Sequence, residues 1–402
     1  MMMTAIPRYR QSAAPAVLSA GFRPFFLLAG IFGAGLLLWW TALLAGWVEA
    51  PATSWPLPLW HAHEMIYGYG MAALAGFLLT AVPNWTGQMP LQGLPLLGLA
   101  LLLLAGRVAL LAEMRLGPSL TALLDLAFPL TFAAVIGREI VTGRNWRNLP
   151  VLGALGVFTL GDALIHAARL RALLDPALGA RLGIATLVML ITLIGGRIIP
   201  SFTRNWLVRL RPDLAPPRLE PWRERLTFGL SALALLVFVF APEGGRLVLA
   251  PLAFGAALAH AARLSLWRGL ATWPEKLLFG LHVGYAWVAV GFAFLGLAAL
   301  APQAVPLTTA LHALTIGAIG SMTLAVMTRA ALGHTGRDLH ATPSIALMYA
   351  AISLAALLRL APLLWPAAGA ALVTASGLVW TAGFASFLAH FAPILATPRR
   401  RS

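Results

Sequence analysis

The sequence has 402 residues, of which 60% are hydrophobic and 10% are charged, and its mean hydropathy is +0.85. This balance excludes a water-soluble domain and indicates an all-α, polytopic membrane protein. The formal net charge of +15 does not indicate nucleic-acid binding, because the basic residues are dispersed among loops and form no basic domain.

Twelve stretches are long and apolar enough to be predicted as transmembrane helices, each needing about 20 mostly apolar residues. In chain order they lie at residues 22–46, 61–82, 94–112, 119–138, 150–169, 182–201, 226–241, 247–266, 275–300, 306–331, 343–362 and 367–392. The short loops leave no room for an extramembrane domain, so residues 1–402 are predicted to form a single membrane domain. The first apolar run is too long for a signal peptide and is expected to be retained.

The arginines and lysines predict how these helices are oriented. Most of the 28 basic residues fall at one set of helix ends, which the positive-inside rule assigns to the cytoplasm. Both termini are then cytoplasmic, as an even number of helices requires. The longest loop on that side, residues 203–226, is rich in arginine and proline and is predicted to join two possible halves, residues 1–210 and 221–402.

The absence of cysteine limits the cofactors that the chain can hold. It excludes disulfides, thiolate-bound iron–sulfur clusters, zinc thiolate sites and covalently attached c-type haem. Any metal must therefore be bound by histidine, carboxylate or methionine.

Ionisable groups inside the apolar helices are the candidate functional residues, because such groups are costly in a bilayer and usually face the bundle interior. One set lies in the outer half of the predicted bundle: His61, His63, Glu64, Asp162, His166 and His312. A second set lies toward the inner side: His260, His282, His334, His340 and His390, with Arg197 at a similar depth. A single membrane histidine more often bridges helices than binds a metal, but several at one depth favour a ligand site.

Helical spacing divides the outer set between two centres. Positions two apart on a helix point about 200° away from each other, so His61 and His63 are not expected to bind one metal. We predict that His63 and His312 approach the iron of a b-type haem, because two imidazoles commonly hold such a haem. His61 and His166 are then available to copper. Asp162, four residues from His166 on the same face, would support the ligands or carry protons, and Glu64 would carry protons.

The inner histidines are assigned less specifically. His282 and His334 are candidate cofactor ligands of a second site, whereas loop or interface roles are favoured for His260, His340 and His390. His312 and His334 are separated by about 33 Å at 1.5 Å per residue, so they cannot share a metal on one continuous helix.

The second and tenth predicted helices show a weak internal similarity. Aligned without gaps, they superpose His63 on His312 and Gly68 on Gly317. The same alignment superposes residues 86–87 on residues 335–336, a Thr-Gly pair in both cases. This predicts that the two histidines lie at the same depth on related helices.

The motifs resemble those of the NnrS family of bacterial inner-membrane proteins over nearly the whole chain. The matching stretches are "GFRPFFLLAG" (21–30), "LWHAHEMIYGYGMAALAGFLLTAVPNWTG" (59–87), "GGRIIPSFTRN" (195–205), "LHVGYAW" (281–287) and "LHALTIGAIGSMTLAVMTRAALGHTGR" (311–337). The resemblance implies a twelve-span protein that contains haem and copper and belongs to the response to nitric oxide and nitrosative stress. It marks as motif residues His61, His63, Glu64, His282, His312 and His334.

Three functions are compatible with these observations, and the first is the leading hypothesis. The first is an oxidoreductase that binds nitric oxide and reduces it to nitrous oxide, with Glu64 and Asp162 carrying protons and a quinol or redox protein donating electrons. The second is a haem-based binder or sensor of nitric oxide that does not turn it over. The third is a secondary transporter, since twelve helices in two halves are typical of such carriers. The gathering of imidazoles at one depth favours the first two.

Overall fold

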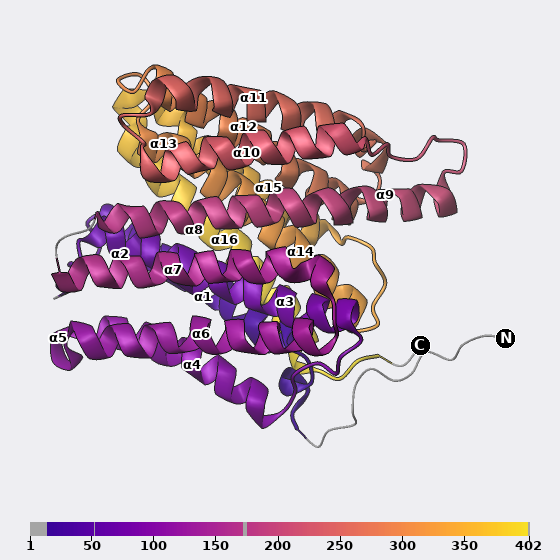
Figure 1. The fold of residues 1–402 in the computed structure, drawn as a ribbon, viewed down its shortest axis with the longest axis horizontal. Helices are drawn as coiled ribbons and strands as arrows, with labels where there is room; N and C mark the ends of the chain where they lie inside the picture. Colours follow the sequence, from indigo (N-terminus) through magenta and orange to yellow (C-terminus); the bar gives the residue numbers. More distant parts are fainter. Residues whose placement is uncertain (1–13, 52, 172–174, 401–402) are drawn as a thin grey trace.

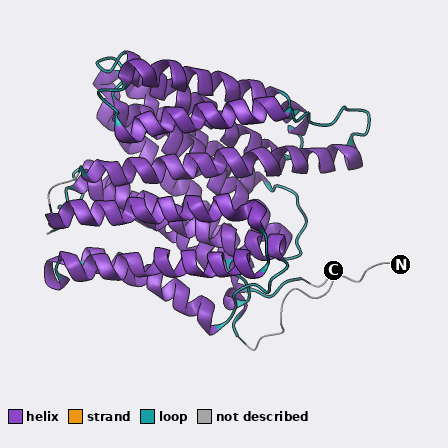
Figure 2. Cartoon of the chain, viewed as in Figure 1, coloured by secondary structure: helices purple, strands orange, loops and turns teal. Residues whose placement is uncertain are grey.

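The structure is a computed structural model that describes residues 14–51, 53–171 and 175–400. Within these ranges the regular structure is helical and no strand occurs (Figure 2). Eleven helices of the described chain are long and apolar enough to cross a membrane by length and composition. The predicted all-α, polytopic membrane bundle is therefore confirmed.

The long elements run roughly antiparallel to one another (Figure 1). The α-helices are α1 (Phe22–Leu44), α2 (Leu57–His63), α3 (Met71–Thr86), α4 (Leu94–Leu111), α5 (Glu113–Leu116), α6 (Pro118–Thr142), α7 (Leu149–Arg171), α8 (Pro176–Leu190), α9 (Gly196–Leu210), α10 (Pro221–Phe240), α11 (Arg246–Ser265), α12 (Lys276–Leu300), α13 (Leu307–His312), α14 (Ser321–His334), α15 (Pro343–Leu360) and α16 (Gly369–Ala396). Short 3₁₀ turns lie at η1 (Ala16–Leu18), η3 (Trp146–Asn148), η5 (Gly269–Thr272), η7 (Ala361–Leu363) and η8 (Pro366–Ala368).

Three spans contain a π-helical segment between two α-helices. The segments are η2 (Glu64–Gly70), η4 (Ile191–Gly195) and η6 (Ala313–Gly320). They join α2 to α3, α8 to α9 and α13 to α14, giving the continuous spans Leu57–Thr86, Pro176–Leu210 and Leu307–His334. We call these three the central spans. Within an 18-residue stretch of each, 83%, 61% and 67% of the residues are buried, the highest values among the eleven candidates. Because π-helical turns are rare and often mark functional sites, the central spans are expected to carry a functional site.

Both ends of the described chain lie at the same side of the bundle. Arg23, in the first turn of α1, donates hydrogen bonds to the carbonyl oxygens of Leu395 and Thr397 at 2.7 and 2.6 Å. We call this side the terminal end and the opposite side the distal end. Figure 1 shows α2, α5 and α13 at the distal end, on the left, and α9 reaching the terminal end, on the right. Which end faces the cytoplasm stays a prediction, as does the division into two halves.

The predicted span at residues 226–241 forms α10 but is not among the eleven helices. Its 20 residues include Arg223, Glu224 and Arg225 near the N-terminus, which shortens the uncharged stretch. Glu224 pairs with Arg263 of α11, the next helix, so this charge joins two helices. Among the described residues, eleven helices therefore meet the length and composition requirement, whereas the sequence predicted twelve.

The internal similarity extends to the backbone. One π-helical segment begins directly after His63 and another directly after His312. Each span is also followed by a glycine with positive φ, 72° at Gly87 and 71° at Gly336. The histidines and the terminal glycines that the alignment superposes thus occupy equivalent positions relative to the π-helical segment and the end of each span.

The close packing of the central spans can be tested at Gly320. A Cβ at this position would lie 2.6 Å from Cη2 of buried Trp380, whose indole N–H donates to the Gly33 carbonyl. We expect Gly320→Ala to destabilise the protein by about 1–3 kcal/mol, the usual cost of overpacking, and to lower the apparent Tm in detergent. Gly153→Ala on α7 is the control, because nothing lies within 4 Å of that Cβ. Equal Tm values for the two variants would contradict the described packing.

Candidate metal centre

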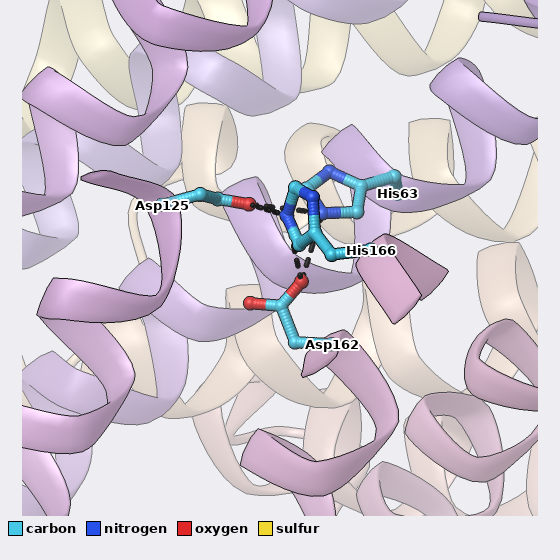
Figure 3. A group of neighbouring side chains, drawn as sticks. All are labelled: His63, Asp125, Asp162 and His166. Atoms are coloured by element: carbon cyan, nitrogen blue, oxygen red, sulfur yellow. Dashed lines mark hydrogen bonds and ion pairs between the residues drawn. The ribbon is translucent and has the colours of Figure 1, made fainter. Parts of the chain in front are cut away.

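Four buried side chains from three helices meet in the distal half of the bundle (Figure 3). They are His63 at the end of α2, Asp125 on α6, and Asp162 and His166 on α7. One possible ligand atom from each lies within 4.8 Å of the others. His63 Nε2 is 2.9 Å from Asp162 Oδ1 and 3.1 Å from Asp125 Oδ2. His166 Nε2 is 2.9 Å from the same Asp125 oxygen. We call these four residues the distal cluster.

Local features of the helices bring these groups together. Asp162 and His166 are four residues apart on α7 and therefore share a face. Asp125 reaches the cluster because α6 packs tightly on α4 at Gly106, where a Cβ would lie 2.6 Å from Asp125 Oδ1 and 3.0 Å from its Cα. His63 enters from the last residue of α2, immediately before the π-helical segment η2.

The distal cluster is connected to a second pair of charges. Arg107 of α4 donates a hydrogen bond to Glu64 Oε1 at 2.8 Å and another to Asp125 Oδ1. Glu64 Oε1 also lies 3.3 Å from His63 Nδ1. All six ionisable side chains are buried. With neutral imidazoles, the three carboxylates and one guanidinium have a net charge of −2, which is costly in an apolar interior. A divalent cation, or protons on both imidazoles, would balance it.

A capping group closes the distal side of the cluster. The Trp55 ring lies with its centroid 5.1 Å from that of His63 and 5.9 Å from that of His166. The Trp55 indole N–H donates to Glu113. Arg169 stacks 3.9 Å from the Trp55 ring centroid and pairs with Glu113 at 2.9 Å. These three residues, the Trp55 cap, separate the cluster from the loops at the distal end.

The other two predicted metal ligands lie together at a different place. His61 stacks on Trp40, with ring centroids 4.5 Å apart, and interacts electrostatically with His312 and Arg359. His312 Nδ1 donates to the Thr308 carbonyl at 2.5 Å, which leaves Nε2 available. The sequence paired His63 with His312 and His61 with His166, whereas the structure places His63 beside His166 and His61 near His312. The expected separation of His61 from His63 around the helix is present.

The two inner candidates, His282 and His334, lie at the terminal end. His282 Nε2 is 2.9 Å from the Thr203 hydroxyl oxygen, and its Nδ1 is buried without a hydrogen-bond partner in the described chain. His334 lines a cavity of about 420 Å³, which we call the terminal cavity. Its walls are mainly apolar, and Arg329 also lines it, stacked 4.4 Å from the Phe202 ring centroid.

The remaining histidines make local contacts, and His260 is buried between helices, whereas a loop or interface role was predicted for it. His260 lies 2.9 Å from the Ser231 hydroxyl and 2.8 Å from the Tyr285 hydroxyl. The His340 side chain is 74% exposed, and His390 Nδ1 lies 3.2 Å from the Ser344 hydroxyl. None of the three belongs to the described groups of potential metal ligands.

Asp125 and Arg107 were not predicted as site residues from the sequence. Asp125 lies in "TALLDLAFPL" (121–130), so an acidic residue within an apolar run was a visible signal. Arg107 lies in "LLLLAGRVAL" (101–110) and was counted among the charges that set the helix orientation. Neither position is close in sequence to a motif histidine, so only the packing of α4 and α6 against α2 and α7 reveals their part in the site.

The NnrS family model, described as NnrS protein, matches residues 16–399. The chain belongs to the NnrS family. It is therefore a membrane protein of a family related to the nitric oxide response. The family is tied to metal binding, and in this NnrS protein the distal cluster is a buried group that could bind a metal. No curated protein matches the chain.

The Trp55 cap predicts a dependence of stability on pH. Burial alone would raise the pKa of Glu113, but hydrogen bonds from Arg169, Ser54 and Trp55 hold the pKa below its ordinary value of 4.5. A carboxylate whose pKa is lower in the folded state contributes stability that is complete above pH 4.5 and disappears as the pH falls through the folded-state pKa. We expect the apparent Tm of the wild type to decrease as the pH drops below 4.5. Glu113→Gln should have a lower Tm than the wild type at pH 7, and its Tm should change less with pH in the acidic range. Parallel pH profiles for the two proteins would refute this role of Glu113.

Proposed function

We propose that this NnrS protein binds nitric oxide at a haem b, holds copper in the distal cluster, and protects a bacterial cell against nitrosative stress from the inner membrane. The observation that carries the proposal is the distal cluster itself. It combines imidazole and carboxylate donors with an excess of negative charge in an apolar interior.

The donor set of the distal cluster fits a divalent transition metal. His63 and His166 offer imidazole nitrogens, and Asp125 and Asp162 offer carboxylate oxygens, a mixed nitrogen and oxygen set that suits copper(II). Arg107 and Glu64 contact two of these residues and would hold their orientation, as partners of metal ligands generally do. Copper bound there would supply one-electron redox chemistry. Its charge would balance that of the carboxylates.

The terminal cavity has the size and the side chains to hold a haem. Its volume of about 420 Å³ lies within the range of cofactor pockets. His334 has no hydrogen-bond partner at either ring nitrogen in the described chain, so one nitrogen is available as an axial ligand. Arg329 has no carboxylate within ion-pair distance among the described residues and would pair with a haem carboxylate. Haem bound there would supply an iron that binds nitric oxide.

The depth of the two places favours binding over reduction. His63 belongs to the distal cluster and Asn84 lines the terminal cavity, and both belong to one continuous span. Their separation of 21 residues corresponds to about 30 Å at 1.5 Å per residue. One nitric oxide molecule cannot contact both places. Haem and copper so arranged would not act together on one pair of gas molecules.

A second haem location would favour reduction. His61 and His312 are electrostatic neighbours beside Arg359, and the bond from His312 Nδ1 to a carbonyl is a common way to orient a ligand imidazole. A haem there would lie in the same half of the bundle as the distal cluster. Two nitric oxide molecules would then be converted with two protons and two electrons to nitrous oxide and water. Glu64 and Asp162 are the candidate proton carriers, and a quinol or redox protein would supply the electrons.

Metal analysis of purified variants tests the copper proposal. We expect His166→Ala and Asp162→Asn to lose at least tenfold in copper content relative to the wild type, because each removes one ligand. His340→Ala is the matched control, since its exposed side chain lies outside the cluster, and it should retain wild-type copper. Wild-type protein without copper after reconstitution would refute the proposal and favour protonated imidazoles in the cluster.

The absorption spectrum of two variants decides where haem is held. We expect His334→Ala to lose most of its haem, and Arg329→Gln to bind haem more weakly, while His312→Ala keeps a wild-type haem content. The opposite result, with haem lost only from His312→Ala, would place haem near the distal cluster. Protein free of both haem and metal would support the transporter hypothesis.

Anaerobic addition of nitric oxide to reduced protein separates binding from turnover. We expect a stable spectral change of the haem and no nitrous oxide, because the two places are far apart. Sustained nitrous oxide release with an artificial electron donor would instead establish reduction.

A further inference from the structure

A second cavity, of about 80 Å³, lies between the three central spans. Its walls come from all three: Gly70 and Ala73 from the first, Leu187 and Ile194 from the second, and Met322 and Val326 from the third. We call it the central cavity. It lies at mid-depth, since Gly70 follows His63 by seven residues, or about 10 Å along the helix.

The walls of the central cavity offer almost nothing to water. Thr323 contributes the only polar side chain among the lining residues. Its hydroxyl already donates to the Ile319 carbonyl at 2.7 Å and is hydrogen-bonded to the Tyr69 hydroxyl. A buried water needs two to four polar partners, whereas apolar cavities stay dry and take up xenon or small hydrocarbons. A volume of about 80 Å³ is large enough for a diatomic molecule, because a water molecule occupies about 30 Å³ in the liquid.

Two glycines in the wall of the central cavity lie at points of close helix packing. Gly70 and Gly195 both belong to π-helical segments and both line the cavity. A Cβ on Gly70 would lie 3.1 Å from Leu187 Cδ1, and one on Gly195 would lie 3.2 Å from the Tyr285 ring. The helices therefore approach closely at these glycines.

The central cavity adjoins the terminal cavity. Phe77, Ile198 and Val326 line both. A gas molecule in the central cavity is thus separated by single side chains from the space that His334 and Arg329 line.

We infer that the central cavity is a binding site for a small uncharged diatomic gas, held next to the terminal cavity. The inference rests on the proposed function only in naming nitric oxide as the gas and haem as its neighbour. The site itself depends on the volume, the apolar walls and their position. Nitric oxide belongs to this class because it is small and uncharged. Its transfer from water costs little free energy, and it needs no hydrogen-bond donor.

Xenon is the probe, because it detects such a site without haem, copper or nitric oxide. In crystals of the full chain under xenon pressure, we expect one anomalous peak between Ala73, Leu187 and Met322. Ala73→Leu fills the space and should remove the peak, and Val326→Leu provides a second variant if the first does not fold. Ala261→Leu, at an exposed position on α11, makes the same change elsewhere and should keep the peak.

Two outcomes would overturn the inference. One is a wild-type structure with no xenon in the cavity, and the other is ordered water in it. A xenon site in protein that binds no haem would uphold the gas site and reject only the proposed function. If haem is present, the fraction of nitric oxide that rebinds before escape after flash photolysis should differ at least twofold between Ala73→Leu and Ala261→Leu.

Discussion

The structure depends on the pairing of charges that the bilayer cannot solvate. Glu64, Asp125 and Asp162 lie in an apolar interior with a single guanidinium, that of Arg107. Removing one partner from such a group costs far more free energy than the group contributes to stability, because the remaining charge stays buried without a partner. The helices α2, α4, α6 and α7 are consequently held in one arrangement by ion pairs and hydrogen bonds as well as by apolar packing. Apolar packing alone does little to specify which helices contact each other in lipid.

Composition and helical period predicted a large part of the fold. The run lengths yielded the helices, and depth alone gathered His63, Asp162 and His166 into one half of the bundle. The pairing of histidines could not be predicted in this way, because it depends on which neighbouring helix each face meets. His61 and His63 were correctly expected on different faces of the helix. The local sequence does not indicate that the face of His63 meets α7, whereas the face of His61 meets α1 and α13.

Two further features were beyond the reach of the sequence for physical reasons. Asp125 reaches the cluster because α6 approaches α4 at Gly106. A glycine in an apolar run does not indicate which helix packs against it. The π-helical segments change the angle between residues before and after them, so positions on one face cannot be projected with a period of 3.6. The terminal cavity likewise arises from residues of α3, α9 and α14 that are far apart in the chain.

The arrangement separates polar and apolar tasks along one axis. A buried cluster of ionisable side chains lies in the distal half under the Trp55 cap, an apolar space occupies the middle, and a larger cavity lined by His334 and Arg329 lies toward the terminal end. The central spans carry residues of all three. A change in their packing would therefore alter each of the three places, two of which share the side chains of Phe77, Ile198 and Val326.

The π-helical segments also constrain how the chain can tolerate deletions. Each residue of an α-helix turns the chain by about 100°, so losing one residue between Glu64 and Gly70 would rotate the preceding turn relative to everything that follows. His63 would leave its carboxylate neighbours while Ala73 kept its position. A shortened variant would thus present a different set of side chains at its distal end while the rest of the span kept its register.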